Sequence, residues 1–184
     1  MDRILVLGGG VGGTLTANLL ARRLKKRLDA GDVDLAVVDA TGAHVYQPGF
    51  MYIAMGGERA EKLQKRERAL LDKRIRLVIG TVSHVDEPAG TVSLTDGTVL
   101  PYDHLVLATG ASILPEAIEH FETEAHHFYT AEAALKLPRA LDAFTGGKIV
   151  IGIASMPYKC PPAPLEVSFL IESELRERGL RDKS

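Results

Sequence analysis

Residues 8–13, with the sequence Gly-Gly-Gly-Val-Gly-Gly, constrain the fold more than any other part of the chain. The apolar run at residues 3–7 predicts a buried parallel strand, and the helical spacing of apolar residues over 14–28 predicts a helix. A glycine-rich turn between such a strand and helix is typical of dinucleotide-binding α/β folds, because the helix N-terminus offers free N–H groups to phosphate. The sequence therefore predicts a nucleotide site at this turn.

The glycines of this turn have separate expected roles. Gly8 permits the tight turn, Gly10 lets a pyrophosphate approach the backbone, and Gly13 lets the helix pack closely on the strand. A second apolar run, residues 35–38, ends in Asp39, which is placed to hydrogen-bond a ribose hydroxyl. This context favours a cofactor site over a glycine-rich turn that is merely structural.

Composition and charge narrow the class of protein. At 184 residues the chain is long enough to bury a core, and its net charge of −2 gives no general basic field, so nucleic acid is not an expected partner. No apolar run reaches the roughly 18 residues of a transmembrane helix and no signal peptide is evident, so a cytoplasmic location is expected. The single cysteine, Cys160, cannot form an intrachain disulfide.

The segment after Asp39 allows two interpretations. Residues 40–57 predict a loop rich in aromatic and methionine side chains, which either covers the core or lines the flat face of a planar cofactor. The sequence leaves these two alternatives open. Residues 58–73 are highly charged, with leucines on one side, and predict a surface helix.

After a third core strand at residues 75–79 the pattern departs from successive βαβ units. Three short β runs follow at residues 81–85, 91–94 and 98–100, separated by Glu-Pro-Ala-Gly and Asp-Gly, which are hairpin signals. A three-stranded meander thus replaces the next crossover helix, unlike the pattern of NAD dehydrogenases. A further buried strand at residues 104–111 ends in small residues that let the backbone approach a ligand.

Beyond that strand the sequence loses its regular apolar pattern and then predicts the elements of a second unit. Residues 112–128 predict a connection, and the histidine pair within it has no second ligand pair at fitting spacing, so no metal site is predicted. Residues 130–144 predict a helix that is broken or kinked near Pro138. Residues 148–153 predict the first strand of a second Rossmann-like unit, with an apolar face that is exposed or covered by another chain.

This second unit is defective as a dinucleotide site. At the spacing of its glycine motif stand Gly152, Ala154 and Pro157, and a proline supplies no N–H and prevents the same close packing. Tight NADH binding is therefore not expected there.

A proline-rich loop instead leads into a predicted helix at residues 165–178 and places Cys160 just ahead of the helix N-terminus. The helix dipole and Lys159 both favour the thiolate. The sequence thus favours a reactive cysteine, the alternative being an inert, buried thiol.

Taken together, these features resemble the sulfide:quinone oxidoreductases, flavoproteins with two dinucleotide-binding domains. The resemblance covers nearly the whole chain and rests on the glycine turn, Asp39, Tyr46-Gln47-Pro48, the meander, Ala108-Thr109-Gly110 and residues 149–183. Its most specific component is the Cys160 loop, with Glu166 six residues later. It implies an α/β fold with a Rossmann-like FAD-binding domain and β-meander crossover at residues 1–115. Residues 116–184 would form a connection and the start of a second Rossmann-like domain.

The same resemblance implies FAD as cofactor and sulfide and quinone as substrates. The residues expected to bind FAD are Gly8, Gly10, Val11, Gly12, Gly13, Asp39, Ala40, Pro48, Val82, Ala108, Thr109 and Gly110. Cys160 would face the isoalloxazine as the flavin-side nucleophile, with Glu166 as a lower-ranked candidate for carrying the proton.

Two departures from the family pattern shape the remaining expectations. Family sulfide oxidation needs a second cysteine from the C-terminal half, whereas this chain has Cys160 alone. The upstream cysteine of some members is replaced by His127-Phe128-Tyr129. The chain is therefore expected to act as an N-terminal portion, with the C-terminal half or a partner chain supplying the quinone site and any membrane association. A homo-oligomer is compatible with the sequence. The alternatives are a type II NADH:quinone oxidoreductase, another pyridine-nucleotide flavoprotein, or an inactive nucleotide-binding fragment.

Overall fold

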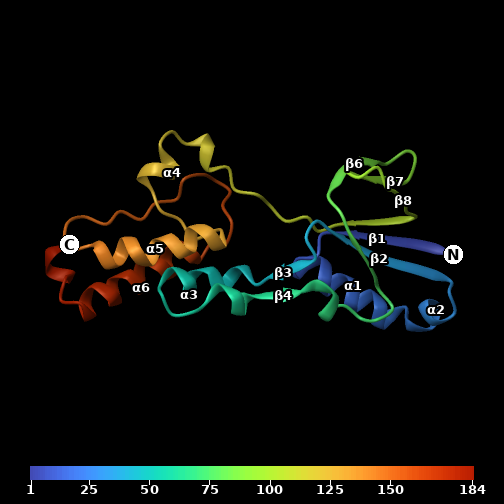
Figure 1. The fold of residues 1–184 in the computed structure, drawn as a ribbon, viewed down its shortest axis with the longest axis horizontal. Coiled ribbons are helices and arrows are strands. Elements are labelled where there is room, and N and C mark those ends of the chain that lie inside the picture. Colours follow the sequence, from blue (N-terminus) through green and yellow to red (C-terminus); the bar gives the residue numbers. More distant parts are fainter. The chain divides into compact units, whose positions relative to one another are not determined.

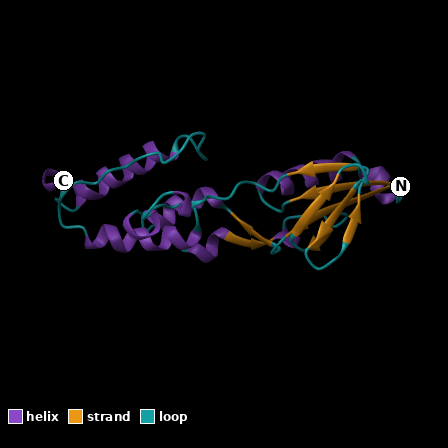
Figure 2. Cartoon of the chain, turned by 90° about the horizontal axis from the view of Figure 1, so that it is seen from above, coloured by secondary structure: helices purple, strands orange, loops and turns teal.

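The computed structural model describes residues 1–184 as two compact units. Unit 1 contains Met1–Tyr46 and Gln64–Ser112, and unit 2 contains Gln47–Leu63 and Ile113–Ser184. All of the strands lie in unit 1, whereas unit 2 is built from helices and loops (Figure 2). The expected α/β class is confirmed. Residues 47–63, which the sequence assigns to the first domain, belong instead to unit 2.

A four-stranded parallel sheet forms the centre of unit 1. Its strands are β1 (Asp2–Leu7), β2 (Val33–Asp39), β5 (Arg76–Ile79) and β9 (His104–Leu107), in the order β5-β2-β1-β9. The two central strands are buried along most of their length, as continuous apolar runs predict for parallel strands. β9 lies at the edge of this sheet and is half-exposed, so the expected fully buried strand at residues 104–111 is wrong in both burial and length.

Alternate residues of the central strands pack into two layers. Ile4 and Val6 face one side, where α1 (Val11–Arg23) contributes Ala17 and Ala21 to the core. Leu5 and neighbouring even-numbered residues of β2 face the opposite side, where the meander packs. The meander consists of β6 (Val82–Asp86), β7 (Thr91–Leu94) and β8 (Val99–Pro101). Figure 1 shows α1 and the meander on opposite sides of β1 and β2, which confirms the predicted replacement of a crossover helix.

The predicted surface helix at residues 58–73 is wrong. The segment forms two 3₁₀ turns, Ala60–Leu63 and Glu67–Ala69, around the short strand β4 (Gln64–Arg66). β4 pairs antiparallel with β3 (Ala43–Val45), and the Glu67 N–H donates to the Gly42 carbonyl. These long-range backbone bonds, together with the complete burial of Glu67, outweigh the helical spacing of the leucines.

The predicted loop at residues 40–57 also contains regular structure. Besides β3 it forms a 3₁₀ turn, Gln47–Gly49, and a short helix, α3 (Phe50–Ala54). Phe50 and Ile53 are buried in unit 2, whereas Tyr46 and Tyr52 are exposed. Phe50 therefore covers core, which settles the open alternative for that aromatic side chain.

Unit 2 contains three further helices, α4 (Phe121–Glu124), α5 (Ala131–Ala143) and α6 (Ala163–Glu177), and two more 3₁₀ turns, Pro115–Ala117 and Arg181–Lys183. The Thr130 hydroxyl accepts from the Ala133 N–H and caps α5. α5 continues through Pro138, so the expected break is absent, because the buried stripe of Ala134, Leu137 and Leu141 offsets the lost backbone bond. The Arg178 guanidinium donates to the carbonyls at the end of α5.

The first helix and the strand expected at residues 148–153 also differ from prediction. The helix expected over residues 14–28 begins earlier, at Val11, and is followed by a separate short helix, α2 (Lys25–Asp29). Residues 148–153 form no strand, and Val150 is 80% exposed. A strand needs a hydrogen-bonded neighbour, and none is present beside this segment. Val150 and Ile153 of this segment are not covered by any other part of this chain.

No helix of the structure is both long and apolar enough to cross a membrane.

The packing of the meander predicts a site-specific loss of stability. Leu94 is 3% exposed and packs under the sheet, so Leu94→Ala is expected to lower the free energy of unfolding by about 2–5 kcal/mol. Val99 in neighbouring β8 is 55% exposed, so Val99→Ala is expected to change the free energy of unfolding by less than about 0.5 kcal/mol. Urea unfolding of both variants checks this, and equal losses would contradict the assigned packing.

Candidate cofactor site

The glycine turn of unit 1 is held by two contacts that exclude any side chain. Gly8 has a φ of +103°, and a Cβ added there would lie 2.3 Å from the Ala108 carbonyl oxygen. A Cβ on Gly13 would lie 1.8 Å from the Gly8 carbonyl oxygen. Both distances are far below van der Waals contact, so glycine is required at both positions. The turn therefore brings the start of α1 directly against the ends of β1 and β9.

The outer side of the same turn is open. A Cβ added to Gly10 or Gly12 would meet no protein atom within 4 Å. Gly10 is the N-cap of α1, has no side-chain capping bond, and is followed by no acidic residue in the first helical turn. The N–H groups at the start of α1 are thus free for an anion, and the helix dipole favours negative charge there. This open backbone cradle fits the pyrophosphate of a dinucleotide.

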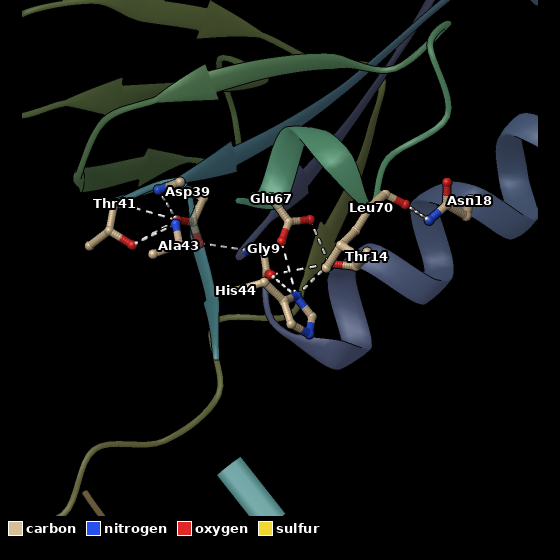
Figure 3. Close-up of polar contacts among 10 residues, drawn as sticks. Gly9, Thr14, Asn18, Asp39, Thr41, Ala43, His44, Glu67 and Leu70 are labelled. Atoms are coloured by element: carbon tan, nitrogen blue, oxygen red, sulfur yellow. Dashed lines mark hydrogen bonds and ion pairs between the residues drawn. The ribbon is translucent and has the colours of Figure 1, made fainter. Parts of the chain in front are cut away.

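Asp39, at the end of β2, is fixed beside the turn (Figure 3). Its Oδ2 accepts from the Gly9 N–H at 2.9 Å, and its Oδ1 accepts from the N–H groups of Thr41 at 3.0 Å and Gly42 at 2.6 Å. Partial burial alone would raise the pKa of Asp39, but the hydrogen bonds from these three amides outweigh it, so its pKa lies below the ordinary value of 3.8. The carboxylate is therefore ionised, and Oδ2 retains room for a further donor such as a ribose hydroxyl.

The other residues of unit 1 predicted to bind the cofactor divide into two groups. Ala40, Val11, Thr109 and Gly110 are exposed at the carboxyl ends of the strands or at the adjoining start of α1. Gly110 has a φ of +73°, a conformation that glycine adopts without strain. Val82 is half-buried and packs against the meander core, so its visible role is structural. The strand ends thus gather at one edge of the sheet, where α/β folds bind their ligands.

Sequence reasoning missed a buried polar cluster directly beside this turn. The side chains of Thr14, His44 and Glu67 hydrogen-bond to one another, and Thr14 and His44 also hydrogen-bond to the Gly9 carbonyl (Figure 3). Glu67 is 0% exposed although it comes from a highly charged segment. Its neighbours in sequence are exposed and charged, so no local signal distinguishes it from a surface glutamate.

Cys160 lies in unit 2, in the loop that precedes α6. Its side chain is exposed, and its φ of +60° is unusual for a residue with a Cβ. The Ala163 N–H donates to the Cys160 carbonyl at 3.0 Å, so the loop joins the first turn of the helix directly. The cysteine is therefore not buried, and its reactivity stays a prediction. Glu166 is exposed in the first turn of α6, and Pro48 is exposed in the 3₁₀ turn before α3.

Side chains on three segments of unit 2 fix the cysteine loop. The Tyr129 hydroxyl donates to the Lys159 carbonyl at 2.7 Å, and the Tyr158 hydroxyl donates to the Pro161 carbonyl at 3.2 Å. The Lys159 ammonium donates to the Gln47 side-chain oxygen, so its hydrogen-bond partner is an amide rather than the thiol. Burial raises the pKa of Tyr129, and the nearby Cys160 and Tyr158 add to that rise. Tyr129 therefore remains a neutral donor.

The fold and the turn define an α/β protein of the dinucleotide-binding type, and the open backbone at Gly10 and Gly12 fits the pyrophosphate of its cofactor. The sequence model of the pyridine nucleotide-disulphide oxidoreductases matches residues 2–152. The chain belongs to this family, and its cofactor is FAD.

Named relatives match nearly the whole chain. The sulfide-quinone reductase of Aquifex aeolicus is 30% identical over 98% of this chain and 41% of its own length. The X-ray structure of the sulfide:quinone oxidoreductase from that bacterium superimposes with a TM-score of 0.79 at 26% identity, covering 100% of this chain and 42% of that one. The type II NADH:quinone oxidoreductase NdhA of Mycobacterium tuberculosis is 32% identical over 80% of this chain and 31% of its own length. The chain thus spans less than half of each relative.

The contrast between inner and outer glycines predicts separable effects. Gly13→Ala forces a Cβ onto the Gly8 carbonyl and is expected to destabilise the fold by about 1–3 kcal/mol. Gly12→Ala meets no protein atom and should leave the apoprotein at least as stable, since alanine favours helix by about 1 kcal/mol. The added methyl group of Gly12→Ala should nevertheless weaken FAD binding. Thermal unfolding and flavin fluorescence titration measure the two effects, and reversed effects would contradict the geometry.

The Asp39 contacts predict a pH-dependent stability difference. Asp39→Asn replaces an acceptor by a donor facing N–H groups and should destabilise the protein by about 1–3 kcal/mol at pH 7. Because the folded pKa lies below 3.8, the contribution of Asp39 is fully present above that value and is lost as the pH falls through the folded pKa. Urea unfolding from neutral to acidic pH should show the gap narrowing below pH 3.8. A constant gap would contradict this role.

Proposed function

We propose that this chain is the flavin-binding part of an oxidoreductase of the sulfide:quinone oxidoreductase type. Such an enzyme oxidises sulfide through a redox cysteine and passes two electrons by way of FAD to a quinone. The observation that carries the proposal is the presentation of Cys160. The only thiol of the chain is exposed, in a strained backbone conformation, on a loop that stands where a second nucleotide-binding turn would otherwise be.

The chain's own residues have distinct roles in this proposal. The free N–H groups at the start of α1 bind the FAD pyrophosphate, and Asp39 accepts a hydrogen bond from the ribose. Ala40, Pro48 and the strand end at residues 108–110 make further cofactor contacts. FAD supplies an acceptor for two electrons from sulfur and a donor to quinone.

Cys160 acts as the nucleophile in this scheme, because its exposed thiol lies in the loop that leads directly into α6. Glu166, exposed one turn into the helix, is proposed as the proton carrier. The hydroxyls of Tyr129 and Tyr158 hold the loop that presents the sulfur.

The proposal assigns other parts of the reaction to residues outside this chain. The chain spans about 40% of the length of the Aquifex aeolicus sulfide-quinone reductase. In the proposed reaction a second cysteine sulfur is needed, and this chain has only Cys160. A C-terminal half or a partner chain would supply that sulfur, the quinone site and the membrane association. The exposed apolar side chains of unit 2, among them Val150, Leu165 and Phe169, offer it an apolar contact surface.

A type II NADH:quinone oxidoreductase is the second candidate, because NdhA is 32% identical over 80% of the chain. Against it stands Pro157, which occupies the place of the third glycine in the second nucleotide motif and lacks an N–H for a phosphate. The two candidate functions therefore predict different reductants for the same flavin, sulfide in the first and NADH in the second.

The test is anaerobic reduction of the flavin in the complete FAD-loaded enzyme, with the C-terminal half or partner chain that supplies the second sulfur present, followed by its visible absorption. Sulfide is expected to bleach the flavin and NADH is not. Cys160→Ser should slow bleaching by sulfide by about 100-fold or more, because the hydroxyl is a far weaker nucleophile than a thiolate. Ser155→Ala, in the same exposed loop, serves as the control and should bleach at the original rate.

Fast bleaching by NADH would favour the second candidate. A rate with sulfide that does not change in Cys160→Ser would rule out this cysteine as the nucleophile. Equal FAD content in all three proteins must be established first, from the absorbance ratio of flavin to protein.

A further inference from the structure

Glu67 is a fully buried carboxyl group in unit 1. It follows β4 directly and is 0% exposed, in a segment whose other charged side chains are largely in contact with solvent. A carboxyl group excluded from water is tolerated only with hydrogen-bond partners, since its desolvation is costly. Its environment is therefore specific, and neither the sheet nor the meander uses it.

The partners of Glu67 come from two other elements. Its Oε1 accepts from the Thr14 hydroxyl of α1 at 2.6 Å, and its Oε2 lies 3.0 Å from His44 Nδ1 of β3. The His44 side chain is 13% exposed. Three segments that are distant in sequence thus converge on one carboxyl group, as Figure 3 shows.

The same side chains reach the glycine turn. His44 Nδ1 lies 2.9 Å from the Gly9 carbonyl oxygen, and Thr14 Oγ1 lies 3.1 Å from it. The N–H of Gly9 donates to Asp39 on the other side. Gly9 is therefore held through both its carbonyl and its amide, and it immediately precedes Gly10, the N-cap of α1.

The number of hydrogens makes His44 the pivot of the cluster. Three oxygen atoms, the Gly9 carbonyl oxygen and the two carboxyl oxygens of Glu67, face the Thr14 hydroxyl and His44 Nδ1–H, which supply two hydrogens. Thr14 is closest to Oε1, so Nδ1–H lies between the Gly9 carbonyl and Oε2 and serves both. The tautomer with hydrogen on Nδ1 follows from these partners. Without the His44 donor, the Gly9 carbonyl oxygen and Glu67 Oε2 would each lose a hydrogen-bond partner.

We propose that His44 and Glu67 are positioning residues for FAD. Glu67 orients the imidazole, and His44 Nδ1–H fixes the Gly9 carbonyl, which holds the following backbone in the geometry that receives the pyrophosphate. Neither residue contacts the cofactor in this proposal. The energetic effect arises because an unfixed turn must be ordered each time FAD binds.

Two substitutions of His44 separate this role from simple packing. The amide of asparagine places an N–H near the position of Nδ1, whereas leucine fills a similar volume without a donor. His44→Leu is expected to raise the dissociation constant for FAD at least about tenfold, and His44→Asn less than about threefold. Flavin fluorescence titration of the apoprotein gives the affinities. Thermal unfolding without FAD reports on the fold.

A second pair tests Glu67 independently of His44. Glutamine can accept from Nδ1–H and donate to Thr14, so Glu67→Gln should bind FAD within about threefold of the original, whereas Glu67→Leu should lose at least about tenfold. Glu87→Leu, in the exposed turn between β6 and β7, is the matched control and should not change FAD affinity.

The comparison within each pair decides the outcome. Recovery of affinity by the hydrogen-bonding variant, in folded protein, supports the proposal. Equal loss in both members of the His44 pair, or affinities for both leucine variants close to the original, would overturn it. If Glu67→Leu fails to fold, the His44 pair decides alone. The His44 side chain is 13% exposed, so its replacement is expected to destabilise the fold less than replacement of the fully buried Glu67.

Discussion

The contact between Gly13 and the Gly8 carbonyl is the constraint on which the structure of unit 1 depends. No side chain fits between them, so α1 starts directly against the end of β1. Close approach at this point lets Ala17 and Ala21 pack on the sheet further along the helix. The same approach leaves the outer backbone of the turn without protein neighbours and with unpaired N–H groups. The packing requirement and the anion site are thus two consequences of one short run of glycines.

Around this turn, the carboxylate of Asp39 accepts from the N–H of Gly9, and the buried cluster of Thr14, His44 and Glu67 holds the carbonyl of the same residue. The carboxyl ends of the parallel strands then provide an edge where a long cofactor can lie. Unit 2 contributes a different chemistry, an exposed thiol on a loop tied down by tyrosine hydroxyls. The glycine turn and the exposed thiol are therefore located in separate compact units of the chain.

The sequence predicts those parts of the structure that local chemistry determines. Continuous apolar runs predict the central strands, hairpin signals predict the meander, and the glycine spacing predicts a dinucleotide-binding turn, whereas FAD as its cofactor follows from the family resemblance. Residues 58–73 were assigned wrongly because the partner of β4 lies some twenty residues earlier, in β3, and local periodicity carries no information about that pairing. The burial of Glu67 has the same origin. Residues 148–153 have the composition of a strand but form none, since β structure requires a neighbour.

The central claim is that the glycine turn of this chain binds FAD rather than a nicotinamide nucleotide. Calorimetric titration of the apoprotein with FAD, in the absence and in the presence of excess NADH, tests it most directly. Saturable binding of one FAD per chain, with an affinity that NADH leaves unchanged, is the predicted result. Competition by NADH for the same site, or no saturable binding of FAD to folded protein, would contradict the account.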